Sequence, residues 1–118
     1  MEGKILIVDD DRSIAQSLEM LFVRDGLEAR CVFSAFEALE VLQVWSPDLV
    51  ISDLKMPGMS GFELLDAVKR SQPNMPVIII SAYDEMQYTI EAIQRGAFDF
   101  IEKPIDVHKL RTLTASVL

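Results

Sequence analysis

The chain has 118 residues, half of them hydrophobic, which is enough to close one core, and we expect a single domain over residues 1–118. Its 11 basic and 19 acidic residues give a net charge of −8, which argues against direct contact with a nucleic acid. One cysteine excludes an internal disulfide, and no apolar run reaches the roughly 18 residues that span a bilayer, so we expect a cytoplasmic protein without membrane contact.

The first part of the chain predicts a buried strand, a helix and a more exposed strand. Residues 4–8 read KILIV, a continuous apolar run typical of strands buried on both faces, and three aspartates follow it. Apolar residues then recur at helical spacing over residues 12–24, where Ser13 and Gln16 can form a capping box. Residues 27–33 alternate only in part, which indicates a strand near the edge of a sheet.

The middle of the chain repeats this pattern. Ser34 and Glu37 predict a capping box for a second helix, which we expect to end near Trp45. An apolar run then leads to Asp53 at the end of a third, buried strand. A third helix is expected to begin near Ser60, with three residues facing inward: Phe62, Leu65 and Val68.

The last part predicts two further strand and helix units. Residues 77–80 are the most β-branched run of the chain and predict a fourth strand, and residues 98–102 predict a fifth. We expect the two following helices to be capped by Asp84 and Asp106 and to carry apolar faces made by Met86, Ile90 and Ile93 and by Leu110, Leu113 and Val117. Five such units with short connections predict an α/β fold, a doubly wound parallel sheet with helices on both faces.

Chemically versatile residues stand where the predicted strands end. Ligands of open parallel sheets bind beyond the carboxyl ends of the strands, where this chain places Asp9, Asp10, Asp53, Ser81 and Lys103. Carboxylates brought together repel one another, and a divalent cation removes that penalty. Oxygen ligands with retained water favour Mg²⁺ over Ca²⁺ or Zn²⁺. Taken singly, however, the aspartates also fit a strand-to-helix turn and a solvated helix start.

Four stretches carry a resemblance to a known family: IVDDD at 7–11, DLVISDLKMPGMSGFELL at 48–65, PVIIISA at 76–82 and GAFDFIEKP at 96–104. In order and spacing they resemble the receiver domain of two-component response regulators, over essentially the whole chain. The resemblance implies a flavodoxin-like sheet of strand order 2-1-3-4-5. It also implies a phosphoacceptor switch and not a turnover enzyme, controlling an effector domain or downstream protein that acts, for example, in transcription.

The resemblance implies a role for each polar residue at this edge. Asp53 would accept a phosphoryl group from a phosphohistidine of a sensor histidine kinase, catalysing only its own phosphorylation and dephosphorylation. Asp10 and Asp53 would bind Mg²⁺ through carboxylates, with the backbone carbonyl of Lys55 as a third ligand and Asp9 acting through water. Lys103 would pair with Asp53 and then with the phosphoryl group, which suits a transfer that depends on positioning and charge neutralisation.

The resemblance further implies a switch. Ser81, supported by Ala82, would move its hydroxyl to the phosphoryl group, and the aromatic ring of Phe100 would swing inward in response. Pro104 would follow Lys103 through a cis peptide bond. Without the resemblance, Ser81 reads as a strand-end cap and Phe100 as a static core residue. The altered surface would be the fourth helix, fifth strand and fifth helix, a face for partners or a homodimer, with these candidate contacts: Met86, Tyr88, Ile90, Val107 and Arg111.

Two other functions stay open. The aspartates after the first strand mimic the D-x-D motif of haloacid-dehalogenase-like phosphatases and phosphotransferases, in which Asp9 would be the covalent residue. The short chain and the lack of a second acidic pair late in the sequence argue against it. A pseudo-receiver that only binds partners would not need the acid, lysine and hydroxyl set.

Overall fold

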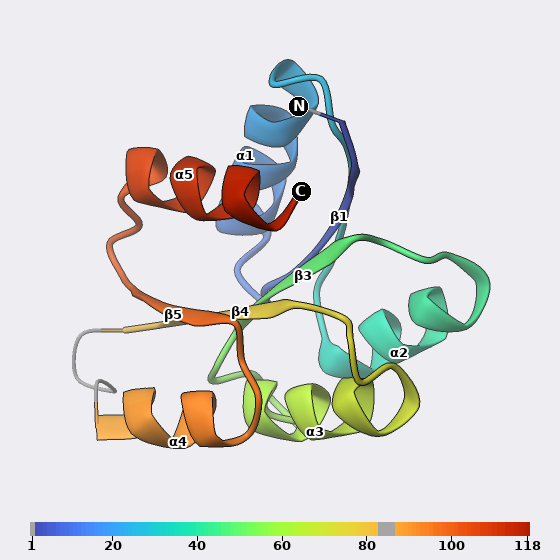
Figure 1. Ribbon diagram of the computed structural model, residues 1–118, viewed down its shortest axis with the longest axis vertical. Helices are drawn as coiled ribbons and strands as arrows, with labels where there is room; N and C mark the ends of the chain where they lie inside the picture. Colours follow the sequence, from blue (N-terminus) through green and yellow to red (C-terminus); the bar gives the residue numbers. More distant parts are fainter. Residues whose placement is uncertain (1, 83–86) are drawn as a thin grey trace.

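The computed structural model describes residues 2–82 and 87–118, and in these residues strands and helices alternate strictly (Figure 1). The order is β1 (Lys4–Val8), α1 (Arg12–Arg24), β2 (Glu28–Val32), α2 (Ala35–Val44), β3 (Leu49–Asp53), α3 (Gly61–Ser71), β4 (Val77–Ser81), α4 (Thr89–Gln94), β5 (Asp99–Glu102) and α5 (Val107–Val117). All strand pairs are parallel, and the sheet order is β2-β1-β3-β4-β5. The predicted doubly wound α/β fold and its strand order are confirmed.

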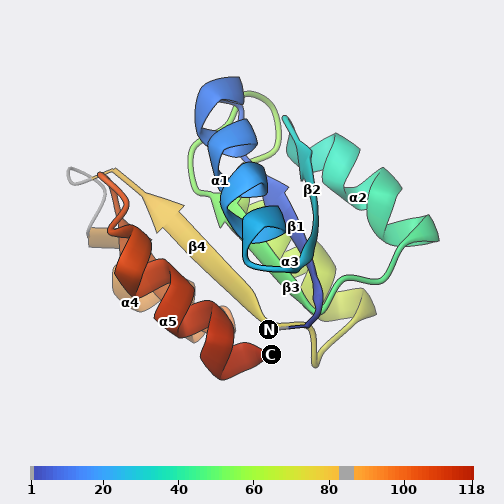
Figure 2. The same cartoon turned by 90° about the horizontal axis from the view of Figure 1, so that it is seen from above.

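The helices cover both faces of the sheet. α1 and α5 lie on one face, and α2, α3 and α4 lie on the other (Figures 1 and 2). Successive side chains of a strand point to opposite faces, so Ile5 and Ile7 join the core under α1 and α5, while Leu6 joins the core under the other three helices. This two-sided burial explains why β1, β3 and β4 read as continuous apolar runs. In the described part of the chain, no helix is long and apolar enough to cross a membrane.

Most of the predicted helix signals are confirmed. The hydroxyl of Ser34 accepts a hydrogen bond from the amide of Glu37 (3.1 Å), and Ser60 and Glu63 form the complete capping box of α3. The carboxylate of Asp106 caps α5. The predicted inward-facing residues of α3 and α5 are buried or half-buried: Phe62, Leu65, Val68, Leu110, Leu113 and Val117.

The capping box predicted at Ser13 and Gln16 is wrong. Asp11 is the N-cap of α1, and its carboxylate accepts a hydrogen bond from the backbone amide of Ile14 (3.2 Å). Because the helix already begins at Arg12, Ser13 lies inside its first turn. A capping side chain bonds to an amide two or three positions further along, a spacing that Asp11 meets as well as Ser13 does.

The apolar face predicted for α4 is wrong in the residues that the structure describes. Ile90 is 71% exposed and Ile93 47% exposed, whereas Ala92 is fully buried. Residues two positions apart in a helix point in directions about 200° apart, so burial of Ala92 turns Ile90 toward solvent. The other predicted members of this helix start, Asp84 and Met86, lie outside the described residues.

Candidate functional site

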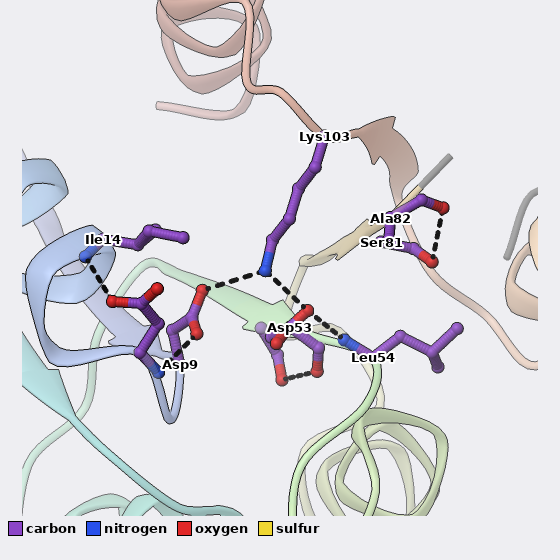
Figure 3. A network of polar contacts seen from close by, with 9 residues as sticks. Asp9, Ile14, Asp53, Leu54, Ser81, Ala82 and Lys103 are labelled. Atoms are coloured by element: carbon purple, nitrogen blue, oxygen red, sulfur yellow. Dashed lines mark hydrogen bonds and ion pairs between the residues drawn. The ribbon is translucent and has the colours of Figure 1, made fainter. Parts of the chain in front are cut away.

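The parallel sheet brings an acid from β1, an acid from β3 and a lysine from β5 to one edge (Figure 3). Asp9 directly follows β1, Asp53 is the last residue of β3, and Lys103 directly follows β5. The Nζ atom of Lys103 lies 3.6 Å from Oδ2 of Asp9 and 3.3 Å from Oδ1 of Asp53. One ammonium group therefore faces two carboxylates that are far apart in the sequence.

A third carboxylate completes an acidic group that fits a metal ion. Asp9, Asp10 and Asp53 each offer an oxygen, and the three oxygens lie within 4.8 Å of one another. Asp9 and Asp53 are only 2% and 7% exposed, while Asp10 is open to solvent. The site thus offers oxygen atoms from two buried carboxylates and one exposed carboxylate. This donor set suits Mg²⁺ that retains some of its water.

Each buried carboxylate is fixed by a backbone amide. Oδ1 of Asp9 accepts a hydrogen bond from the amide of Asp11 (2.9 Å), and Oδ1 of Asp53 accepts one from the amide of Leu54 (3.0 Å). These hydrogen bonds hold the two carboxylates in fixed directions before any ligand binds.

The electrostatics of the site leave negative charge uncompensated. Burial raises the pKa of Asp53 to about 6, and the charge of Asp9 adds to this shift, while Lys103 and the Leu54 amide oppose it. Burial also raises the pKa of Asp9, against the Asp11 amide and Lys103. Burial by itself would lower the pKa of Lys103, but the two carboxylates together raise it. A divalent cation would reduce the repulsion between the carboxylates and favour their charged forms, so the residues present fit Mg²⁺.

The predicted switch residues lie next to this group. Ser81 ends β4 and is fully buried, and its hydroxyl donates to the carbonyl oxygen of Ala82 (3.4 Å; Figure 3). Phe100 on β5 is 8% exposed and belongs to the core cluster that contains Ala92 of α4. The ring is thus already turned inward. The peptide bond before Pro104 is cis, as expected.

The remaining predicted residues that the structure describes are exposed or half-buried. Lys55 is exposed, two residues beyond Asp53, and the role of its backbone carbonyl as a ligand stays a prediction. Of the residues predicted to contact partners, Ile90 and Val107 are exposed and Tyr88 is half-buried. Arg111 is exposed, but its guanidinium donates two hydrogen bonds of 2.8 Å to Asp25 at the end of α1. Met86 lies outside the described residues.

Sequence reasoning missed two residues that contact the backbone of Asp53 and of the following Leu54. The hydroxyl of Ser52 donates to the carbonyl oxygen of Asp53 (2.9 Å), and the amide of Gly61 donates to the carbonyl oxygen of Leu54 (2.7 Å). A polar residue inside an apolar strand and a glycine at a helix start were visible signals. Neither signal shows which backbone group is contacted.

The sheet of order 2-1-3-4-5 defines a flavodoxin-like domain. At its carboxyl edge, the buried Asp53 lies next to Lys103 and two further aspartates. The model of the response regulator receiver domain family matches residues 5–115, and the chain belongs to that family, the receivers of two-component systems. This membership does not favour the haloacid-dehalogenase alternative.

Relatives and solved structures agree with the family. The DNA-binding transcriptional regulator NtrC of Escherichia coli (strain K12) is 40% identical over 105 residues, which are 89% of this chain and 22% of that protein. The response regulator PilR of Pseudomonas aeruginosa is 38% identical over 115 residues, which are 98% of this chain and 26% of PilR. The receiver domain of NtrX from Brucella abortus superposes with a TM-score of 0.92 at 35% identity, covering 97% of each chain. The chain thus spans about a quarter of the length of the curated relatives it matches.

Proposed function

We propose that residues 1–118 form one receiver domain, in which Asp53 accepts a phosphoryl group from the phosphohistidine of a sensor histidine kinase. The observation that carries the proposal is the position of the Lys103 ammonium, 3.3 Å from Oδ1 of Asp53 and 3.6 Å from Oδ2 of Asp9. Of these two buried acids, Asp53 is the one on the central strand β3, and it lies in the stretch that resembles the acceptor segment of the family.

The transfer needs little more than alignment and charge compensation. An oxygen of the Asp53 carboxylate attacks phosphorus, a new P–O bond forms, the P–N bond to the donor histidine breaks, and its electron pair stays on the imidazole nitrogen. The Lys103 ammonium is placed to pair with the added negative charge. The carboxylates of Asp10 and Asp53, the Lys55 carbonyl and Asp9 through water would hold Mg²⁺, which when bound neutralises carboxylate and phosphoryl oxygens. Water later hydrolyses the acyl phosphate, which returns the domain to its resting state.

Ser81 and Phe100 change position in response to the transferred phosphoryl group. The hydrogen bond from the Ser81 hydroxyl to Ala82 is long, 3.4 Å, so a phosphoryl oxygen is a better acceptor for it. Because Phe100 is already buried against the α4 side of the core, its response is a shift within packed surroundings. The shift would alter the face formed by α4, β5 and α5.

The altered face serves a partner, either an effector domain or a second copy of the chain. Ile90, Ile93 and Phe98 are 71%, 47% and 47% exposed, which supplies apolar contact area near α4 and β5. NtrC is described as DNA-binding, and the net charge of −8 assigns any DNA contact of this protein to a region outside the receiver.

Phosphorylation with a small donor tests the acceptor. After incubation with Mg²⁺ and acetyl phosphate, mass spectrometry should locate the added phosphate on Asp53, and Asp53→Asn or chelation of Mg²⁺ should abolish it. As a matched control, Asp48→Asn removes the same charge at the opposite end of β3 and should be labelled normally. A label on Asp9 would support the haloacid-dehalogenase chemistry instead.

A further inference from the structure

The backbone directly behind the acceptor carboxylate is held from two sides. Ser52 is fully buried within β3, and its hydroxyl donates to the carbonyl oxygen of Asp53 (2.9 Å). On the other side Gly61, the first residue of α3, donates its amide to the carbonyl oxygen of Leu54 (2.7 Å). Ser52 therefore binds the carbonyl of the Asp53–Leu54 peptide, and Gly61 binds the carbonyl of the next peptide, Leu54–Lys55.

Gly61 has no room for a side chain. A Cβ atom at this position would overlap the carbonyl oxygen of Asp53 and lie 2.8 Å from the Cα atom of Leu54. Both contacts are with backbone, which cannot turn away as a flexible side chain can. The start of α3 cannot move back either, because the Ser60 capping box and the buried Leu64 anchor it. Any larger residue at Gly61 must therefore displace the acceptor segment.

The displaced peptide is the one that orients the acceptor carboxylate. The amide of Leu54 donates both to Oδ1 of Asp53 (3.0 Å) and to the carbonyl oxygen of Ile80 on β4 (2.9 Å). A shift of this amide changes the direction of the carboxylate relative to Lys103 and moves the following residue, Lys55. The geometry of the site thus depends on backbone contacts that touch no ligand.

We propose that Gly61 and Ser52 are positioning residues of the phosphoacceptor site, which act through the Asp53–Leu54 peptide. This inference rests on the proposed function, because it concerns the same carboxylate. Gly61 acts by allowing close approach of α3 to the end of β3, and Ser52 acts by binding the carbonyl of Asp53 from within the sheet.

The first test compares two glycine variants. Gly61→Ala should weaken Mg²⁺ binding, measured by calorimetry, by about tenfold or more, as is typical when support behind a metal ligand is lost. It should also slow labelling by acetyl phosphate and, without metal, speed hydrogen exchange at the Leu54 amide. Gly96→Ala is the control, because Gly96 has φ +100° and packs against the side chain of Lys69, far from the acceptor. It should lower stability but leave Mg²⁺ affinity and Leu54 exchange unchanged.

A second pair of variants covers the case in which Gly61→Ala does not fold. Ser52→Ala removes one hydroxyl and should weaken Mg²⁺ binding and speed exchange at Leu54, while Ser52→Thr keeps the hydroxyl and should restore much of both. Unchanged Mg²⁺ affinity and exchange in Ser52→Ala and in folded Gly61→Ala would overturn the inference.

The outcomes separate this inference from the proposed function. If the wild-type chain is never labelled on Asp53, the proposed function fails, whereas Leu54 exchange in the variants still tests the positioning role. If wild type and both variants are labelled equally fast with equal Mg²⁺ affinity, the function stands and the positioning role is wrong.

Discussion

Asp53 sits in surroundings that penalise its charged form. The residue is 7% exposed, the Asp9 carboxylate is nearby, and the single ammonium of Lys103 faces both carboxylates. An isolated domain would be more stable with a neutral side chain at this position. Functional sites commonly carry such local costs, because the same uncompensated charge that weakens the fold attracts the ligand.

Asp53→Asn should therefore stabilise the metal-free domain at neutral pH. The pKa of Asp53 is raised to about 6 in the folded state, so the folded chain binds more protons than the unfolded chain between roughly pH 4 and pH 6, and stability falls as pH rises through that window. The amide cannot ionise, and we expect a gain of about 1–2 kcal/mol at pH 7 that fades toward pH 4. Urea unfolding at both pH values, in the presence of a chelator, measures it.

The control for this prediction is Asp48→Asn. Asp48 is exposed, and its carboxylate accepts a hydrogen bond from the amide of Lys4 (2.9 Å), so its replacement should bring no gain at pH 7. A less stable Asp53→Asn variant at pH 7 would show that the bonds of the carboxylate to Lys103 and Leu54 outweigh its burial.

At the scale of elements, α4 reaches the core through one buried residue, and side chains at its two ends contact α3. Its buried residue is Ala92. At its end, Arg95 pairs with Asp66 on α3 and stacks over the ring of Phe62, 4.8 Å from the ring centre. Phe62 also meets the ring of Tyr88 edge to face, with centres 5.7 Å apart. A short helix held by half-exposed polar and aromatic contacts is suited to shift when Phe100 beneath it moves.

Arg95→Ala should loosen α4 selectively. The ion pairs of Arg95 with Asp66 and Glu91 and its contact with the Phe62 ring are partly exposed, so we expect a loss of only about 0.5–1 kcal/mol in global stability but clearly faster hydrogen exchange across residues 89–95. The matched control is Arg111→Ala. It also removes an arginine that is paired with an aspartate, but this pair, Arg111 with Asp25, joins α5 to α1. It should leave exchange in α4 unchanged. Equal exchange in both variants would mean that α4 is held by other contacts.

The elements also show what periodicity can and cannot predict. The strands, the caps at Ser34, Ser60 and Asp106 and the inward face of α3 follow from local patterns, because each depends on residues a few positions apart. The face that α4 turns to the core does not follow from such a pattern. Ile90 and Ile93 fit helical spacing equally well whether they face the core or the solvent. The small Ala92 is the residue that faces the core.

At the scale of the whole molecule, the site could be predicted because the carboxyl ends of parallel strands lie side by side at one edge of the sheet. Asp9, Asp53 and Lys103 needed only the rule that parallel strands deliver their carboxyl ends to one edge. The contacts of Ser52 and Gly61 could not be predicted, because they depend on how closely α3 approaches β3, and this distance is set by packing throughout that side of the sheet.

Because a domain of this size typically unfolds as one unit, a metal bound at this edge should stabilise the whole molecule. At a free Mg²⁺ concentration ten times the dissociation constant, the free energy of unfolding should rise by about 1.4 kcal/mol. Asp10→Asn removes a carboxylate of the acidic group and should lose most of this gain. Asp11→Asn removes the neighbouring charge, yet asparagine still caps α1, so it should keep the gain. Denaturant unfolding with and without Mg²⁺ measures each value, and an undiminished gain in Asp10→Asn would show that Asp10 is not a ligand.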